Sequence, residues 1–379
     1  MKGIKKTISG LLILCVLVSM LPVSVFAETA EPVNTPGDID GNRILDTDDV
    51  IQLLLHISLP DLFPLELDVE FSGDGELTSD DVVQLLLHIS LPELFPLHVG
   101  KTKEGRLYLE KKGQLLSINI PSGQGNDLYL QFGFVLDVNQ AINLNQYRLK
   151  SMYLVDADYA RVHTLKSVTE IEGVIQEVGS SDFIGGYHGD ESFEFCTVLA
   201  DGTEKPMDGD DYTMYCDTLD IMVKSTVNAM DNAQDKVFTR YKHLVFSGNT
   251  LTIENDWTAL RSVNIGFGYM TMMSLPITSN GAYVCQYCKD NVNGVVQEIL
   301  GERLENGPFT FTNGVSCIEQ WSDILSVKSE GEINFAGNKS LIGFVSTQQF
   351  NTAKAYFLFR GYMRGGQKIT GKSVHTFAF

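Results

Sequence analysis

Carboxylate, hydroxyl and amide side chains recur at alternate positions of two short stretches near the N-terminus. In the first stretch the candidate ligands are Asp38, Asp40, Asn42, Asp46 and Asp49, together with the backbone carbonyl of Ile44. Counted from Asp38, the side chains stand at positions 1, 3, 5, 9 and 12, and Ile44 stands at position 7. Ca²⁺ takes about six to eight oxygen ligands in loops of this spacing, so the stretch predicts a calcium site.

A second stretch repeats this scheme 32 residues later (81 − 49 = 32). Its candidate ligands are Glu70, Ser72, Asp74, Glu76 and Asp81, with weaker ligands at positions 1 and 3 than in the first stretch. Position 6 is Gly75 here but Arg43 in the first stretch, where a sharp turn normally needs glycine. The alternative is that both stretches are acidic turns that cap helices and hold no metal.

Each stretch leads into a segment rich in leucine, "DDVIQLLLHIS" or "DDVVQLLLHIS". The paired aspartates at its start favour the positive end of a helix dipole. Because each segment is apolar over much of its circumference, neither helix is stable alone, and we expect the two to pack face to face.

Two calcium loops in tandem, each followed by one helix, resemble a type I dockerin domain over residues 37–97. The resemblance implies Ca²⁺ as the cofactor and, as the partner, a cohesin domain on a scaffoldin or cell-surface protein of a polysaccharide-degrading assembly. Dockerins carry partner-recognition residues at loop positions 10 and 11. These are Thr47 and Asp48 in the first copy and Ser79 and Asp80 in the second, so either copy presents a similar surface.

The N-terminal segment predicts export of the chain. Residues 1–27 combine early lysines, an apolar run and the ending Val25-Phe26-Ala27, a pattern typical of a cleaved signal peptide, and residues 28–36 form a linker. The formal net charge of −20 disfavours nucleic acid and anionic membranes as partners. We therefore expect a secreted, extracellular protein that associates with a cell surface through a cohesin.

The cysteines do not predict a disulfide framework. Six are present, and loss of Cys15 with the signal segment leaves the odd number of five. Cys285 and Cys288 form a C-x-x-C motif, but "AYVCQYC" has the character of a strand, in which residues three apart point to opposite faces. Buried thiols are the simplest interpretation, and a zinc or redox site that includes Cys317 or His243 is the alternative.

Residues 100–379 show alternating apolar and polar stretches punctuated by Gly, Asn and Asp. This pattern predicts a mostly antiparallel β-sandwich of the jelly-roll or concanavalin-like kind, possibly in two sub-domains. Together with an α-helical, EF-hand-like dockerin domain at residues 37–99, the predicted fold class is α+β.

The stretch "SSDFIGGYHGDESFEF" at 180–195 places Tyr187, His188, Asp190 and Glu191 in one glycine-rich turn. A Tyr or His can abstract a sugar C5 proton in a lyase, and paired carboxylates can act in a glycoside hydrolase, so these four are the candidate catalytic residues. Arg240 is a candidate cation to neutralise a carboxylate. The turn has a weak resemblance to those of polysaccharide depolymerases, and the alternative is a hairpin with solvated polar side chains.

Two functions follow for residues 100–379. The first is a polysaccharide lyase or glycoside hydrolase tethered through dockerin–cohesin binding, and the second is a non-catalytic module that binds carbohydrate or protein. Dockerin carriers are usually carbohydrate-active, which favours the enzyme by association alone. A sugar ring would stack on Trp257 or Trp321, although core packing explains both residues as well.

Overall fold

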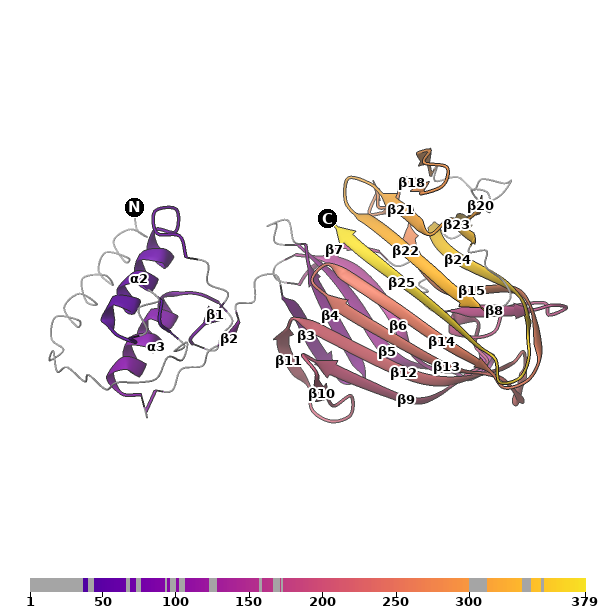
Figure 1. Ribbon diagram of the computed structural model, residues 1–379, viewed down its shortest axis with the longest axis horizontal. Helices are drawn as coiled ribbons and strands as arrows, with labels where there is room; N and C mark the ends of the chain where they lie inside the picture. Colours follow the sequence, from indigo (N-terminus) through magenta and orange to yellow (C-terminus); the bar gives the residue numbers. More distant parts are fainter. Residues whose placement is uncertain are drawn as a thin grey trace. The chain divides into compact units, whose positions relative to one another are not determined.

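The computed structural model of this protein describes residues 37–39, 44–65, 69–72, 76–92, 94–95, 100–101, 106–122, 128–156, 159–165, 171, 173–299, 312–335, 342–348 and 351–379 (Figure 1). The chain forms two compact units, the N-terminal unit (Met1–Glu104) and the β unit (Gly105–Phe379). The expected signal segment and linker, residues 1–36, lie outside the described residues. Neither described helix has the length and apolarity that a bilayer-spanning helix needs.

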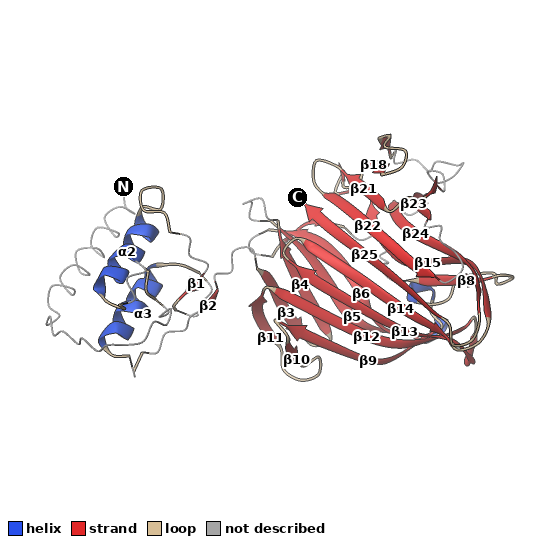
Figure 2. Ribbon diagram, viewed as in Figure 1, coloured by secondary structure: helices blue, strands red, loops and turns tan. Residues whose placement is uncertain are grey.

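The chain is mostly β, and the predicted α+β class is therefore wrong (Figure 2). Among the described residues, α-helix is confined to two segments of 12 residues each. The N-terminal unit is likewise not the purely helical EF-hand-like domain that was expected, because its helices are accompanied by a two-stranded sheet. The two helices contribute only 12 residues each, whereas strands run through most of the β unit, so the chain as a whole is β.

The helices are α2 (Thr47–Ser58) and α3 (Ser79–Ser90), and the 3-10 turns are η1 (Gln140–Ile142) and η2 (Gly186–His188). The strands are β1 (Val69–Glu70), β2 (Gly100–Lys101), β3 (Leu107–Lys112), β4 (Leu115–Pro121), β5 (Tyr129–Asn139), β6 (Leu144–Val155), β7 (Arg161–Thr164), β8 (Val174–Glu177), β9 (Glu191–Ala200), β10 (Thr203–Lys205), β11 (Tyr212–Cys216), β12 (Thr218–Ala229), β13 (Asn232–Ser247), β14 (Thr250–Ala259), β15 (Val263–Pro276), β16 (Thr278–Ser279), β17 (Ala282–Tyr283), β18 (Tyr287–Asp290), β19 (Gln297–Glu298), β20 (Thr312–Asn313), β21 (Cys317–Trp321), β22 (Ser326–Phe335), β23 (Ile342–Gln348), β24 (Thr352–Met363) and β25 (Lys368–Ala378).

The N-terminal unit is built around the repeat. Helices α2 and α3 pack through one small core, in which Val50 and Leu53 of the first helix meet Val82 and Leu85 of the second beside Phe71. The two helical pairs are 32 residues apart (82 − 50 and 85 − 53), so both copies bury the same positions. Burial of these side chains offsets the marginal stability of two short helices.

The β unit consists mainly of two facing sheets, a sandwich-like layering that agrees with the sequence prediction. The large sheet has 16 strands, with the main order β11-β3-β4-β5-β6-β9-β12-β13-β14-β25-β22-β21-β18-β19. The small sheet has five strands in the order β20-β23-β24-β15-β8. Pairing is antiparallel among the described strands, except for two residue pairs between β6 and β9.

The main core lies between these sheets. Phe246 and Phe377 of the large sheet share one buried cluster with Leu275 and Phe357 of the small sheet. The approach is so close that a Cβ atom on Gly331 of β22 would lie 2.6 Å from the ring of Phe357. A glycine is needed there because no side chain fits between the layers.

One histidine of the large sheet, His375, points into the core of the β unit. His375 on β25 is fully buried, and its Nδ1 and Nε2 each lie 2.8 Å from a hydroxyl, those of Ser329 and Ser373 respectively. Burial lowers the pKa of His375 to about 3, because the interior cannot hydrate an imidazolium. The folded protein therefore holds a neutral imidazole.

We expect His375 to make the β unit acid-sensitive. An unfolded chain protonates histidine near pH 6.5, whereas the folded chain does so near pH 3, so stability falls as the pH drops through this window. Between pH 7 and pH 5 the loss from this residue is about 2 kcal/mol. Urea unfolding at both pH values measures it through tryptophan fluorescence, since Trp257 and Trp321 both belong to the β unit.

In the variant His375→Gln, the unfolding free energy should fall between pH 7 and pH 5 by about 2 kcal/mol less than in the wild type. His56→Gln is the control, because His56 lies in the other unit. Equal pH dependence in wild type and His375→Gln would contradict the prediction.

Candidate functional site

Asp49, the predicted calcium ligand at position 12 of the first loop, binds backbone N–H groups of that loop. Asp49 is fully buried in the first turn of α2. Its Oδ1 accepts a hydrogen bond from Ile39 N at 2.6 Å and its Oδ2 accepts one from Asp46 N at 2.9 Å. Asp46 caps the helix by accepting from Asp48 N at 2.8 Å, which makes the start of α2 a capping box.

The second loop repeats these contacts atom for atom. Asp81 is fully buried, its Oδ1 accepts from Phe71 N at 2.6 Å, and its Oδ2 accepts from Thr78 N at 2.6 Å. Thr78 caps α3 by accepting from Asp80 N at 3.2 Å. Helix capping is therefore present at both loops, and it occupies lone pairs of the same carboxylates that were predicted to bind calcium.

The remaining predicted calcium ligands are only partly described. Asp40, Asn42 and Asp74 lie outside the described residues, and Glu70 is placed on β1. Asp38 and Ser72 are half-buried, whereas Ile44 and Glu76 are exposed. The part of the chain that is described contains no group of three or more His, Cys, Asp or Glu side chains able to hold a metal ion. Calcium binding stays a prediction.

The predicted partner-binding residues lie on the surface at the starts of the helices. Asp48, Ser79 and Asp80 are exposed and Thr47 is half-buried. Exposed apolar side chains flank them at equivalent positions of the repeat, among them Ile51 with 43% and Val83 with 44% of its surface accessible. The two copies thus present similar mixed surfaces.

All five cysteines of the β unit are free thiols. Cys285 and Cys288 are buried, and burial raises the pKa of both, that of Cys288 to about 12. Such thiols are protonated at neutral pH and poor metal ligands. This placement fits the interpretation of buried structural thiols.

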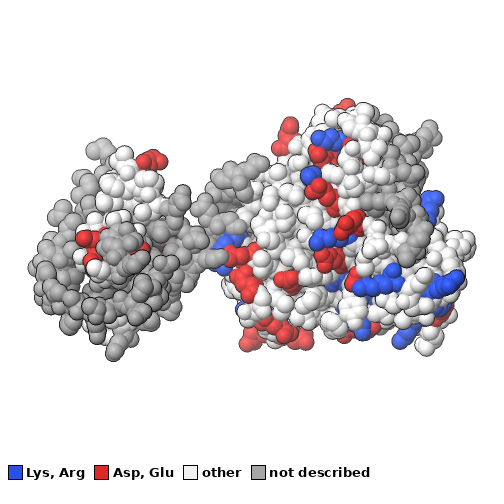
Figure 3. Space-filling model, viewed as in Figure 1, with Lys and Arg blue, Asp and Glu red and all other residues white. Residues whose placement is uncertain are grey.

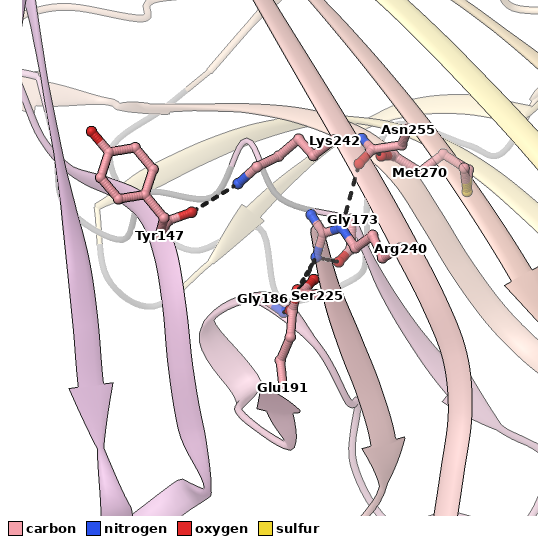
Figure 4. Close-up of polar contacts among 9 residues, drawn as sticks. All are labelled: Tyr147, Gly173, Gly186, Glu191, Ser225, Arg240, Lys242, Asn255 and Met270. Atoms are coloured by element: carbon pink, nitrogen blue, oxygen red, sulfur yellow. Dashed lines mark hydrogen bonds and ion pairs between the residues drawn. The ribbon is translucent and has the colours of Figure 1, made fainter. Parts of the chain in front are cut away.

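Glu191 of the glycine-rich turn lies in the interior of the β unit, where Arg240 of β13 binds it (Figure 4). Both side chains are almost fully buried, at 0% and 1% exposure, and Arg240 Nη1 lies 3.0 Å from Glu191 Oε2. Gly186 N donates to the same oxygen at 2.8 Å, and the hydroxyl of Ser225 donates to Oε1. The cation expected at Arg240 does neutralise a carboxylate, but the pair belongs to the core.

The polar contacts continue from Arg240 toward the small sheet. Its Nη1 also donates to Gly173 O at 3.3 Å, and its Nε donates to Asn255 Oδ1 at 3.4 Å (Figure 4). Asn255 in turn donates to Met270 O on β15 at 2.7 Å. The ring of Trp257 lies 5.4 Å from the guanidinium, so this tryptophan is a core residue.

The other three predicted catalytic residues separate into buried and exposed groups. Asp190 is buried, and its carboxylate accepts from Asn143 Nδ2 at 3.1 Å and from Asp231 N at 3.2 Å. Tyr187 is half-exposed, and the side chain of His188 is 29% exposed beside Asp182. Asp190 and Glu191 are thus committed to internal hydrogen bonds and cannot reach a polysaccharide in this fold. Proton transfer by Tyr187 or His188 stays a prediction.

A polar groove that the sequence did not predict crosses the outer face of the large sheet. It has a volume of about 450 Å³ and lies where β14, β25 and β22 run side by side. Its lining side chains are Glu254, Asp256, Glu332, Ile333, Asn334, Thr370 and Lys372. Lys372 Nζ lies 2.8 Å from Glu254 Oε1, and this hydrogen bond lowers the pKa of Glu254, which keeps that carboxylate ionised.

The sequence indicates one row of this groove but not the residues on the neighbouring strands. Glu254 and Asp256 alternate with buried Ile253, Asn255 and Trp257, as expected of an outward-facing row. The neighbours of this row depend on strand pairing. Lys372 lies between Glu254 and Glu332 because β25 pairs with β14 on one side and with β22 on the other.

No family model matches this chain, and no curated protein matches it. Similar solved structures include the galactosidase domain of an alpha-galactosidase–sucrose kinase, with a TM-score of 0.37 and 8% identity over 70% of this chain and 41% of that one. A GH36 alpha-galactosidase from Geobacillus stearothermophilus has a TM-score of 0.39 and 7% identity over 70% and 40% of the two chains. A galactose mutarotase related enzyme from Lactobacillus acidophilus has a TM-score of 0.34 and 8% identity over 72% and 97%. The chain spans about two fifths of the first two structures.

We expect loss of Arg240 to destabilise the β unit severely. Arg240→Met leaves the Glu191 carboxylate buried without its cation, which costs about 3 to 5 kcal/mol of unfolding free energy. Arg261 is the matched control, because its guanidinium binds Glu177 and Asp235 but is 33% exposed. Arg261→Met should cost about 1 kcal/mol or less. Urea unfolding of both variants decides the matter, and equal losses would refute a structural role for the buried pair.

Proposed function

We propose that this protein is a secreted carbohydrate-binding component of a polysaccharide-degrading assembly. In this proposal the N-terminal unit binds Ca²⁺ through its two loops and docks, as a dockerin does, to a cohesin on a scaffoldin or cell-surface protein. The β unit binds a polysaccharide without cleaving it. Export follows from the signal segment expected at residues 1–27.

The identical closure of the two loops is the observation that carries the docking proposal. In each copy the position-12 carboxylate holds the backbone N–H groups of positions 2 and 9, through Asp49 in one and Asp81 in the other. Calcium loops with ligands at alternate positions turn those side chains toward one point. The predicted donors there are carboxylate, hydroxyl, amide and carbonyl oxygens, which suit a hard cation such as Ca²⁺.

The surface beside the loops supports a protein partner. Ile51 and Val83 are exposed at equivalent positions of the two helices, and Leu59 and Leu91 repeat this at the helix ends, at 47% and 49% exposure. Exposed apolar residues near polar recognition residues are typical of protein interfaces. Because each copy carries its own set, either copy can present the docking surface.

Binding, rather than cleavage, is supported by the placement of the carboxylates. A glycosidase needs one protonated carboxyl group as general acid and a second carboxylate close to it. Asp190 and Glu191 are internal, and in the groove the pKa of Glu254 is lowered rather than raised. A glycoside hydrolase that uses Asp190 and Glu191 is therefore disfavoured, and the non-catalytic alternative accounts better for the placement of these carboxylates. A lyase that uses Tyr187 or His188 is the second candidate, because both side chains are partly exposed.

We expect the full chain to bind two calcium ions. Asp49→Asn and Asp81→Asn should each reduce the stoichiometry to one, because each removes the charge of one position-12 ligand. Asp48→Asn and Asp80→Asn are matched controls, since these exposed carboxylates are adjacent in sequence but outside the ligand scheme. Isothermal titration with CaCl₂ measures the stoichiometry. No calcium uptake by the wild type, or two ions in all four variants, would exclude this scheme.

We expect docking to survive the loss of either copy but not of both. Alanine at Thr47 and Asp48, or at Ser79 and Asp80, should leave cohesin binding within about threefold of the wild type. The variant with alanine at all four positions should lose about 2 kcal/mol or more of binding free energy, which is typical of a residue cluster at the centre of an interface. Asp61→Ala on an exposed turn is the control. Surface plasmon resonance against a panel of type I cohesins gives the affinities, and complete loss in one paired variant would show that the copies are not equivalent.

A further inference from the structure

We propose that the polar groove on the outer face of the large sheet is a binding site for neutral, hydroxyl-rich glycans and that it rejects anionic ones. The inference rests on the carbohydrate-binding role proposed above and names the site and the ligand class. The groove volume of about 450 Å³ lies within the range of small-ligand sites, roughly 300 to 1,000 Å³.

Strand register arranges the polar groups of the groove in two rows. In one row Lys372 of β25 lies between Glu254 of β14 and Glu332 of β22. In the next row Thr370 lies between Asp256 and Asn334. Since neighbouring strands are about 4.8 Å apart, three strands present these groups over about 10 Å. A ligand that crosses the strands meets carboxylate, ammonium, hydroxyl and amide groups at regular intervals.

These groups match the chemistry of a sugar ring. Carboxylates accept hydrogen bonds from hydroxyl groups, whereas the Lys372 ammonium donates to hydroxyl and ring oxygens. Glu254 is ionised because Lys372 lowers its pKa, so it acts as an acceptor. Hydrogen bonds to charged groups are the stronger kind. The two rows therefore suit a ligand with many hydroxyl groups along its length.

The balance of charge sets the ligand class. The lining holds three carboxylates, those of Glu254, Asp256 and Glu332, and one ammonium, that of Lys372. Lys368 Nζ lies 2.6 Å from Asp256 Oδ2, and His243 Nδ1 lies 3.7 Å from Glu254 Oε2. With His243 counted as neutral, three carboxylates against the ammonium groups of Lys372 and Lys368 leave a formal sum of −1 (−3 + 2). Acidic and basic side chains lie interspersed over the face of the β unit seen in Figure 3. A uronate or sulfate group would meet like charge here, and a neutral glycan would not.

A partly exposed aromatic ring lies beside the same rows, and Lys224 Nζ lies over it at 5.5 Å from the ring centroid. Tyr241 of β13 lies directly opposite Asp256 in the pairing of β13 with β14, on the outward face, and is 49% exposed. Tyrosine offers one apolar face and one polar tip, which suits a partly solvated ligand.

The test uses affinity gel electrophoresis of the full chain with soluble polysaccharides in the gel. Galactomannan, xyloglucan and mixed-linkage β-glucan are the neutral probes, and polygalacturonate and chondroitin sulfate are the anionic probes. EDTA in all gels removes any contribution from calcium at the N-terminal loops. We expect at least one neutral probe to retard the protein and the anionic probes to leave its mobility unchanged.

Two variants, one on β22 and one on β13, locate the binding site. Glu332→Ala should weaken retardation by the neutral probe at least tenfold in apparent affinity, and Tyr241→Ala should do the same. Glu330→Ala is the matched control, because Glu330 lies on the same strand and face, is 50% exposed and pairs with Lys328 outside the groove. It should bind like the wild type. Tryptophan fluorescence verifies that all three variants are folded.

The possible failures are distinguishable. Absence of retardation by every probe would overturn the carbohydrate role as well as the groove. Retardation that Glu332→Ala and Tyr241→Ala leave unchanged would overturn the groove alone. Retardation by polygalacturonate or chondroitin sulfate equal to that by the neutral probes would overturn the ligand class.

Discussion

The buried contact between Glu191 and Arg240 is the interaction on which the arrangement of the β unit depends. A carboxylate with no exposed surface is tolerated only where donors surround it, and here they come from three separate segments, through Gly186, Ser225 and Arg240. The guanidinium then reaches Asn255, which binds the small sheet. One series of polar contacts thus links the glycine-rich turn to strands β12, β13 and β14 of the large sheet and to β15 of the facing sheet.

Because the inner polar residues of these strands are paired with one another, the outer face of the same strands is the side open to a ligand. In an antiparallel sheet successive side chains point to opposite faces, so strands whose inner residues are paired leave the alternate residues for solvent. On β14 the inner row includes Asn255 and Trp257, and the outer row includes Glu254 and Asp256. The neighbouring β25 places Lys372 in the same outer row. The core and the groove are therefore two faces of the same strands.

The N-terminal unit stabilises both of its short helices with the same set of contacts. Two helices of 12 residues are marginal in water, and each gains a capping box, a buried carboxylate that closes the preceding loop, and a partner helix. Asp49 and Asp81 serve helix capping and loop closure at once.

Local patterns in the sequence determined the repeat, the starts of both helices and the alternating strands, because these depend on neighbours within a few residues. For Arg240 they left two interpretations open, a neutralising cation and a residue on an outward-facing strand row. Only the tertiary structure decided that Glu191 is its internal partner, since the two are 49 residues apart and meet through β12. The groove was likewise beyond sequence reasoning, because strand order brings Glu254, Lys372 and Glu332 together. Residues so distant along the chain leave no local periodicity from which their meeting can be inferred.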